Sequence, residues 1–176
     1  MITMDKKISS ARVNDSQKKT AKVRNLAEIR EDIDALSEII FSALAERKKH
    51  GFSADSYSIA IEDNPEDISR CYVSILELLC ENNMHAKITP QVRAIDTKIM
   101  SLIQKRTALG IKALASKRKA GLALRDIERE NEIFESAKKI AANYRIDPKT
   151  GADIMSLIVK KTINLEEKEE PADATD

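Results

Sequence analysis

The sequence predicts an all-α bundle of about five helices, and three observations support this fold class. Asn64, Thr89 and Asp147 are each followed by Pro, and a capping side chain before Pro at the first helical position is typical of a helix start. Apolar residues in the segment 90–119 recur mostly three and four positions apart, as on one face of an α-helix. Aromatic residues make up only 3% of the chain and Trp is absent, which argues against broad β-sheets.

The start, stop and spacing signals define the elements in order. Asp126 is a further candidate cap, and turn signals fall at Gly51, near Gly121 and around 143–145. Only the segment 55–61 is ambiguous between helix and strand, and we expect no strand elsewhere. The expected helices span residues 24–49, 65–83, 90–119, 127–144 and 148–166.

Length and charge restrict the class of protein. A chain of 176 residues fits one ordinary domain or two small halves that share a core, and its net charge of +1 gives no general attraction to nucleic acid or membrane. The sequence contains neither an apolar run long enough to span a bilayer nor a secretory signal, so we expect a cytoplasmic protein without a membrane span. Residues 1–23 read as a basic disordered tail and residues 167–176 as an acidic one.

Cysteine and histidine usage gives no sign of a metal or redox site. Cys71 and Cys80 lie nine positions apart on one expected helix, too far apart to bridge each other, so both are expected to be reduced thiols. The two histidines, His50 and His85, are far apart in sequence. We therefore expect no metal site.

Two cations lie on the apolar stripe of the expected helix 90–119. Arg106 and Lys117 are eleven positions apart, so they point the same way at roughly 16 Å along the axis. A buried cation is costly unless an anion meets it. That anion could be a bound ligand, or it could belong to the protein, with Asp126 and Glu130 as candidate partners in a structural network.

The last two helices also carry polar groups on their inward faces. Glu130 precedes the apolar stripe of 127–144, while Thr162 and Glu166 share a face with the apolar residues of 148–166. Simpler readings stay open for these positions: Thr162 as a small core residue, Glu166 as a frayed helix end, and Glu130, like its neighbour Arg129, as surface charge. Gly110, in the middle of its helix, indicates close helix packing.

A weak internal repeat relates the two parts of the chain at one constant spacing. Residues 24–84 form a first copy with two expected helices, and residues 85–166 form a second copy with three. The same spacing separates every matched pair, and these pairs include Arg47 with Arg106, Asp67 with Asp126, Ile68 with Ile127 and Arg70 with Arg129.

The second copy, over residues 89–166, resembles a bacterial chorismate mutase of the all-helical class. The segment Arg125-Asp126-Ile127-Glu128-Arg129-Glu130 carries the resemblance, together with Arg106 and Lys117 at the family's spacing. Members of that class are three-helix chains that dimerise by exchanging their long first helix. The resemblance implies an isomerase that rearranges chorismate to prephenate in aromatic amino-acid biosynthesis, without a cofactor.

The resemblance also implies the site residues. Arg106 and an arginine from the partner would bind the two carboxylates, with Thr162 and Arg129 assisting. Lys117 would donate to a carboxylate and the ether oxygen, and protonated Glu166 would reach that oxygen from the other side. The ring hydroxyl would be held by Glu130 and by the backbone near Asp126. The implied catalytic set is Arg106, Lys117 and Glu166.

One family position is missing from the second copy. The arginine that the partner subunit supplies is replaced by Thr89, whereas the first copy has this arginine as Arg30. The first copy in turn lacks the lysine, with Ser58 in its place, and the glutamate, with Cys71 in its place. These complementary losses suggest a fused pseudo-dimer in which helix 24–49 brings Arg30 to the second copy.

Such a chain would have one working pocket and need no homodimer to build it, so it could be a monomer or a homodimer. The site around Arg47 and Arg70 would be vestigial. Two other functions stay open. A related isochorismate–pyruvate lyase shares the fold but lacks the carboxylate at the position of Glu130, and a helical regulatory or interaction protein could keep a relic pocket without turnover.

Overall fold

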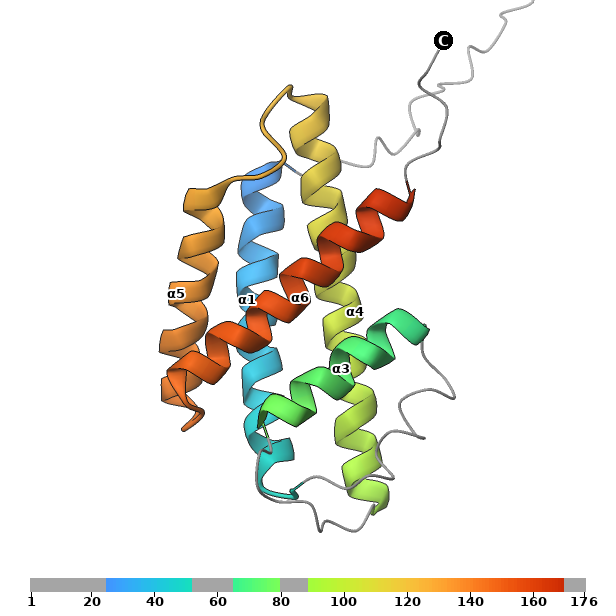
Figure 1. Cartoon of the computed structure of the whole chain (residues 1–176), viewed down its shortest axis with the longest axis vertical. Coiled ribbons are helices and arrows are strands. Elements are labelled where there is room, and N and C mark those ends of the chain that lie inside the picture. Colours follow the sequence, from blue (N-terminus) through green and yellow to red (C-terminus); the bar gives the residue numbers. More distant parts are fainter. Residues whose placement is uncertain (1–24, 52–64, 80–88, 170–176) are drawn as a thin grey trace, which may run out of the picture.

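A computed structural model describes residues 25–51, 65–79 and 89–169, without the side chains of residues 166–169. All regular structure in these segments is helical, which confirms the predicted all-α class (Figure 1). Residues 55–61, Asn64, Cys80, His85 and both tails lie outside the described residues. The helices are α1 (Leu26–Lys48), α3 (Glu66–Leu79), α4 (Pro90–Lys119), α5 (Ile127–Asn143) and α6 (Pro148–Glu169).

Short polar side chains begin three of these helices, as the sequence predicts. Thr89, Asp126 and Asp147 each accept a hydrogen bond from the backbone N–H three residues downstream, at 3.2, 3.0 and 2.9 Å. Each bond satisfies a donor that the first helical turn leaves without a partner. Asp126, the cap of α5, also lines the cavity described below.

Left-handed backbone ends three of the helices. Gly51 follows α1 with φ 68°, and Gly121 follows α4 with φ 65°. Arg145, after α5, has φ 58° and is the one non-glycine residue with positive φ in the described segments. Glycine adopts this region without strain, and the turn signals expected near these three positions are confirmed.

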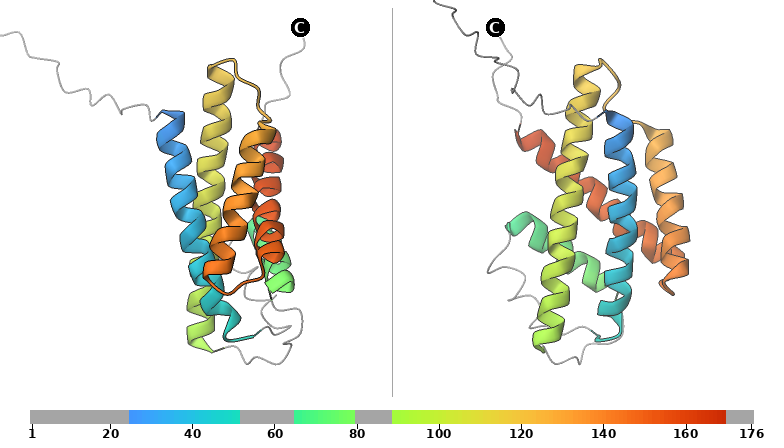
Figure 2. Two further views of the ribbon diagram at one scale, coloured as in Figure 1. Left: turned by 90° about the vertical axis from the view of Figure 1, so that its left-hand side faces the viewer. Right: turned by 180° about the vertical axis from the view of Figure 1, so that it is seen from behind.

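The two longest helices form the centre of the bundle. α1 and α4 run antiparallel and side by side, while α3 and α6 cross one face of this pair (Figure 2). α5 packs on α6 and also touches α1. Within the described helices, none is both long and apolar enough to span a bilayer.

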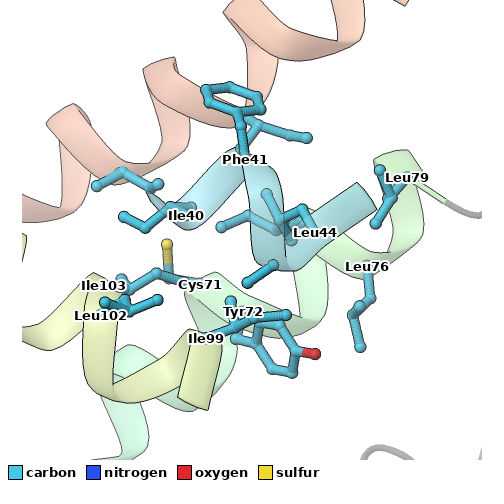
Figure 3. Close-up of a cluster of buried hydrophobic side chains, with 14 of the residues drawn as sticks. Ile40, Phe41, Leu44, Cys71, Tyr72, Leu76, Leu79, Ile99, Leu102 and Ile103 are labelled. Carbon is cyan, nitrogen blue, oxygen red and sulfur yellow. The ribbon is translucent and has the colours of Figure 1, made fainter. Parts of the chain in front are cut away.

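One buried cluster joins all five helices. Ile40 and Phe41 of α1 pack with Tyr72 of α3 and with Ile99 and Ile103 of α4 (Figure 3), and α5 and α6 add further apolar side chains. Burying each large apolar side chain contributes about 1.5–3 kcal/mol. This core fixes α1 against α4 and therefore fixes how their polar side chains face each other.

Cys71 belongs to the same cluster. Its thiol is free and buried, and burial raises its pKa to about 11. A thiol with so high a pKa is rarely ionised near neutral pH, and the thiolate is the reactive form. Cys71 is thus an unreactive core residue, in agreement with the reduced state expected for it.

Candidate active site

A cavity of about 380 Å³ lies between α1, α4, α5 and α6. All the site residues implied by the resemblance line it, apart from Glu166, whose side chain lies outside the described residues. They come from both copies of the repeat. These residues are Arg30, Arg106, Lys117, Asp126, Arg129, Glu130 and Thr162.

Arg106 is the most buried cation of the cavity, with 3% of its surface exposed. Its Nε donates a hydrogen bond to Ser37 Oγ at 3.0 Å, and no described carboxylate lies within ion-pair distance. Burial lowers its pKa to about 10, with Asp34 acting to raise it and Arg129 to lower it further. A buried guanidinium without an acidic partner is a strong candidate for binding an anionic ligand.

Asp126 joins two further cations at the cavity. Arg30 Nη2 donates to Asp126 Oδ2 at 3.1 Å, and Lys117 Nζ lies 3.9 Å from the same oxygen. Lys117 is 8% exposed and also donates to the carbonyl oxygen of Leu124 at 3.1 Å. The backbone N–H of Arg129 lowers the pKa of Asp126, and Lys117 and Arg30 lower it further. The carboxylate therefore stays ionised, and Arg30 reaches the second copy.

Arg129 and Glu130 each have a protein partner. Arg129 Nη2 donates to both carboxylate oxygens of Asp34 at 2.8 Å, and its Nη1 donates to Glu132 at 3.1 Å. Burial acts to lower the pKa of Arg129, but these two carboxylates outweigh it and the pKa is raised. Glu130 accepts from Arg125 Nε and Nη2 at 3.3 and 3.1 Å.

Thr162 of α6 packs against Gly110 of α4. It is 6% exposed and donates to the carbonyl oxygen of Ile158 at 3.0 Å, so only its acceptor positions are left for a ligand. A Cβ on Gly110 would meet Thr162 Cγ2 at 2.5 Å. Gly110 thus permits the close helix packing that the sequence indicates, and this packing brings Thr162 to the cavity.

The corresponding residues of the first copy are arranged differently. Arg47 is fully buried, and its Nε donates to Asp96 Oδ1 at 2.5 Å. It also donates to the carbonyl oxygen of Gly51, and the hydroxyl of Tyr72 donates to Asp96. The side chain of Arg70 is 77% exposed and pairs with Glu66 of its own helix. The structure does not bring Arg47 and Arg70 together.

Sequence reasoning missed three residues that organise these contacts. Asp34 and Ser37 follow Arg30 by four and seven positions, a spacing that places them on the same face of α1. Asp96 follows Ser37 at the spacing of the repeat, the one that separates Arg106 from Arg47. The spacing could have identified each of these three positions, but none lies in the segment 125–130 that carries the resemblance.

Comparisons with known proteins point to one family. The family described as chorismate mutase type II matches residues 88–167. A chorismate mutase of Methanocaldococcus jannaschii is 28% identical over 75 residues, which are 43% of this chain and 76% of that protein. No solved structure matches the chain. Residues 88–167 thus match the chorismate mutase type II family, which confirms the resemblance to the all-helical class and indicates an isomerase.

Proposed function

We propose that the chain rearranges chorismate to prephenate in one cavity that is built from both copies of its repeat. The observation that carries this proposal is the meeting of Arg30 from α1 with Arg106 and Lys117 from α4 around one cavity. Arg106 has only the hydroxyl of Ser37 as a described partner. A small dianion would supply the missing negative charge.

The chemistry fits a site made of fixed charges. The rearrangement is intramolecular, so the protein has to hold a compact conformer and stabilise the charge that develops as the ether C–O bond breaks. Arginine forks suit planar carboxylates. In this proposal Arg30 and Arg106 bind the two carboxylates, and Lys117 donates to a carboxylate and to the ether oxygen.

The remaining groups have orienting roles. Glu130 and the backbone at Asp126 hold the ring hydroxyl. Arg129 supports the carboxylates, and Thr162 does so by turning its O–H from the carbonyl oxygen of Ile158 to the ligand. Glu166 donates from its protonated form to the ether oxygen. Lys117 and Arg30 already share the carboxylate of Asp126, so we expect the substrate to compete with Asp126 for these cations.

The same arrangement supports a pseudo-dimer within one chain. α1 takes the place of the helix that a partner subunit exchanges in the family, and it delivers Arg30 across the two copies. Arg47, the counterpart of Arg106, is already paired with Asp96. We therefore propose one working cavity per chain, in a cytoplasmic monomer or homodimer whose cavity does not depend on self-association.

A spectrophotometric assay of chorismate consumption tests the proposal. We expect turnover by the unmodified protein and a loss of about 10²–10³-fold in kcat/KM for Arg30→Ala and for Lys117→Ala, comparable to removing one charge-stabilising donor from an active site. Arg70→Ala is the matched control, because it removes an exposed arginine of the first copy, and it should keep full activity.

Two outcomes would contradict the proposal in different ways. Full activity in Arg30→Ala would show that α1 does not complete the site. A protein that is inert on chorismate would favour a regulatory role, and one that converts isochorismate instead would favour the lyase. The carboxylate of Glu130 at the cavity favours the mutase over the lyase.

A further inference from the structure

We propose that Asp34 is a positioning residue of this active site, which holds the guanidinium of Arg129 at the edge of the cavity. The inference rests on the proposed function and extends it to a residue outside the segment that resembles the family. Both carboxylate oxygens of Asp34 accept from Arg129 Nη2 at 2.8 Å. The Arg129 side chain is only 20% exposed, whereas that of Asp34 is 52% exposed. Asp34 therefore holds a residue that lines the cavity, although it does not line the cavity itself.

Asp34 takes part in one of two ion pairs between α1 and the N-terminal end of α5, and the acid is on α1 in one pair and at the start of α5 in the other. Along α1, Arg30 is followed one turn later by Asp34, and along α5, Asp126 is followed one turn later by Arg129. Arg30 pairs with Asp126 at 3.1 Å, and Asp34 pairs with Arg129 at 2.8 Å. A shift of one turn between the helices would place like charges together, which is unfavourable. The two pairs thus select one register of α5 on α1.

The counterparts of these residues form no such pair. At the spacing of the repeat, the position that corresponds to Asp34 is Arg93, which cannot accept from an arginine. Arg70, the counterpart of Arg129, is exposed and pairs with Glu66 in its own helix. The acid is therefore present only where its helix faces the cavity. This distribution is expected of a residue that serves the site, and general helix stability does not require it.

Asp34 also acts on the second arginine of the cavity. Its charge raises the pKa of Arg106, whereas the charge of Arg129 lowers it. Asp34 therefore offsets the repulsion between two cations that face the same ligand. Without Asp34, Arg129 would keep Glu132 of its own helix as its described acidic partner and would lose the contact that holds it where it supports a bound carboxylate.

The test measures the steady-state kinetics of Asp34→Ala and Asp34→Asn on chorismate. A double-mutant cycle then combines Asp34→Ala with Arg129→Gln. We expect Asp34→Ala to raise KM by about tenfold with kcat within about twofold, as for two groups in direct contact. Asp34→Asn should lie between it and the unmodified protein. Adding Arg129→Gln to Asp34→Ala should cost little more, because Arg129 is no longer held in position once its contact with Asp34 is lost. Glu38→Ala, which removes another exposed acid of α1, should leave KM unchanged.

Two results would overturn the inference. One is a KM for Asp34→Ala that matches that of Glu38→Ala in an active enzyme. The other is full multiplication of the Asp34→Ala and Arg129→Gln effects in the double variant. Thermal melts of each variant identify a loss of fold, in which case the isosteric Asp34→Asn variant decides the question. An unmodified protein that is inert on chorismate would overturn both proposals, whereas a normal Asp34→Ala enzyme would overturn this one alone.

Discussion

Arg106 and Arg47 occupy matching positions of the repeat on the two central helices, but the partner of Nε differs between them. Both are buried, at 3% and 0% exposure. Arg106 Nε donates to Ser37, and Arg47 Nε donates to Asp96. Ser37 and Asp96 are themselves matching positions of the repeat, so each arginine meets the same position of the opposite copy. A hydroxyl stands at one of these positions and a carboxylate at the other.

This difference separates function from stability. Arg47 has its anion within the protein, together with the hydroxyl of Tyr72 and the carbonyl oxygen of Gly51, and does not line the cavity. Arg106 lines the cavity, has no described acid at ion-pair distance, and has a pKa lowered to about 10 by its burial. Duplicated arginines thus have opposite roles: Arg47 fixes the fold, and Arg106 stays available to a ligand.

The largest expected effect comes from replacing each arginine by Met. Arg106→Met should lower kcat/KM by about 10²–10³-fold with little loss of stability, because replacing a buried charge with an apolar group of similar size is often neutral. Arg47→Met should keep kcat and KM but reduce the free energy of unfolding by about 3–5 kcal/mol, because Asp96 is left buried and unpaired. Urea unfolding measures the stability of each variant, and chorismate kinetics give its kcat and KM. Equal losses of stability in the two variants would contradict the different roles of Arg47 and Arg106.

A smaller effect is expected where α4 crosses α6. Gly110→Ala would place its Cβ 2.5 Å from Thr162 Cγ2, and overpacking of this kind costs about 1–3 kcal/mol. We expect a lower melting temperature and a higher KM, because α6 carries Thr162 at the cavity. Adding Thr162→Ser removes Cγ2 and keeps the hydroxyl, so the double variant should regain most of the stability. If the double variant melts no higher than Gly110→Ala, the close contact is not the cause.

The smallest effect concerns pH, and it separates two titrating groups. In the proposed site, the charged guanidinium of Arg106 binds a carboxylate. Burial lowers the pKa of Arg106 to about 10, so its contribution should be present below that pH and lost as pH rises through it. If kcat/KM already falls with rising pH well below pH 10, this fall would report loss of the proton from Glu166, and Glu166→Gln should remove it. In this variant kcat/KM should be flat from about pH 6 to 9 and halved near pH 10. A steep loss between pH 6 and 9 that persists in Glu166→Gln would refute the role of Glu166.

Much of the fold could be predicted from local signals. The helix Pro90–Lys119 begins and ends at the predicted residues because Thr89 and Pro90 define its start and the apolar spacing continues through it. Asp126 caps α5 as expected. These features depend on neighbours within a few residues, which the sequence displays directly. The inward positions of Arg106, Lys117 and Thr162 follow from helical periodicity for the same reason.

The sequence by itself determined the helices, the repeat and the set of cations that face inward, because periodicity and capping are properties of neighbouring residues. The tertiary structure decided which cations keep an anion of their own. The contacts of Asp34 with Arg129, of Ser37 with Arg106 and of Asp96 with Arg47 join residues 95, 69 and 49 positions apart. They form only because the tertiary packing sets α1 against both α4 and α5, and the geometry of the α1–α4 packing pairs Arg47 with an acid and leaves Arg106 at the cavity.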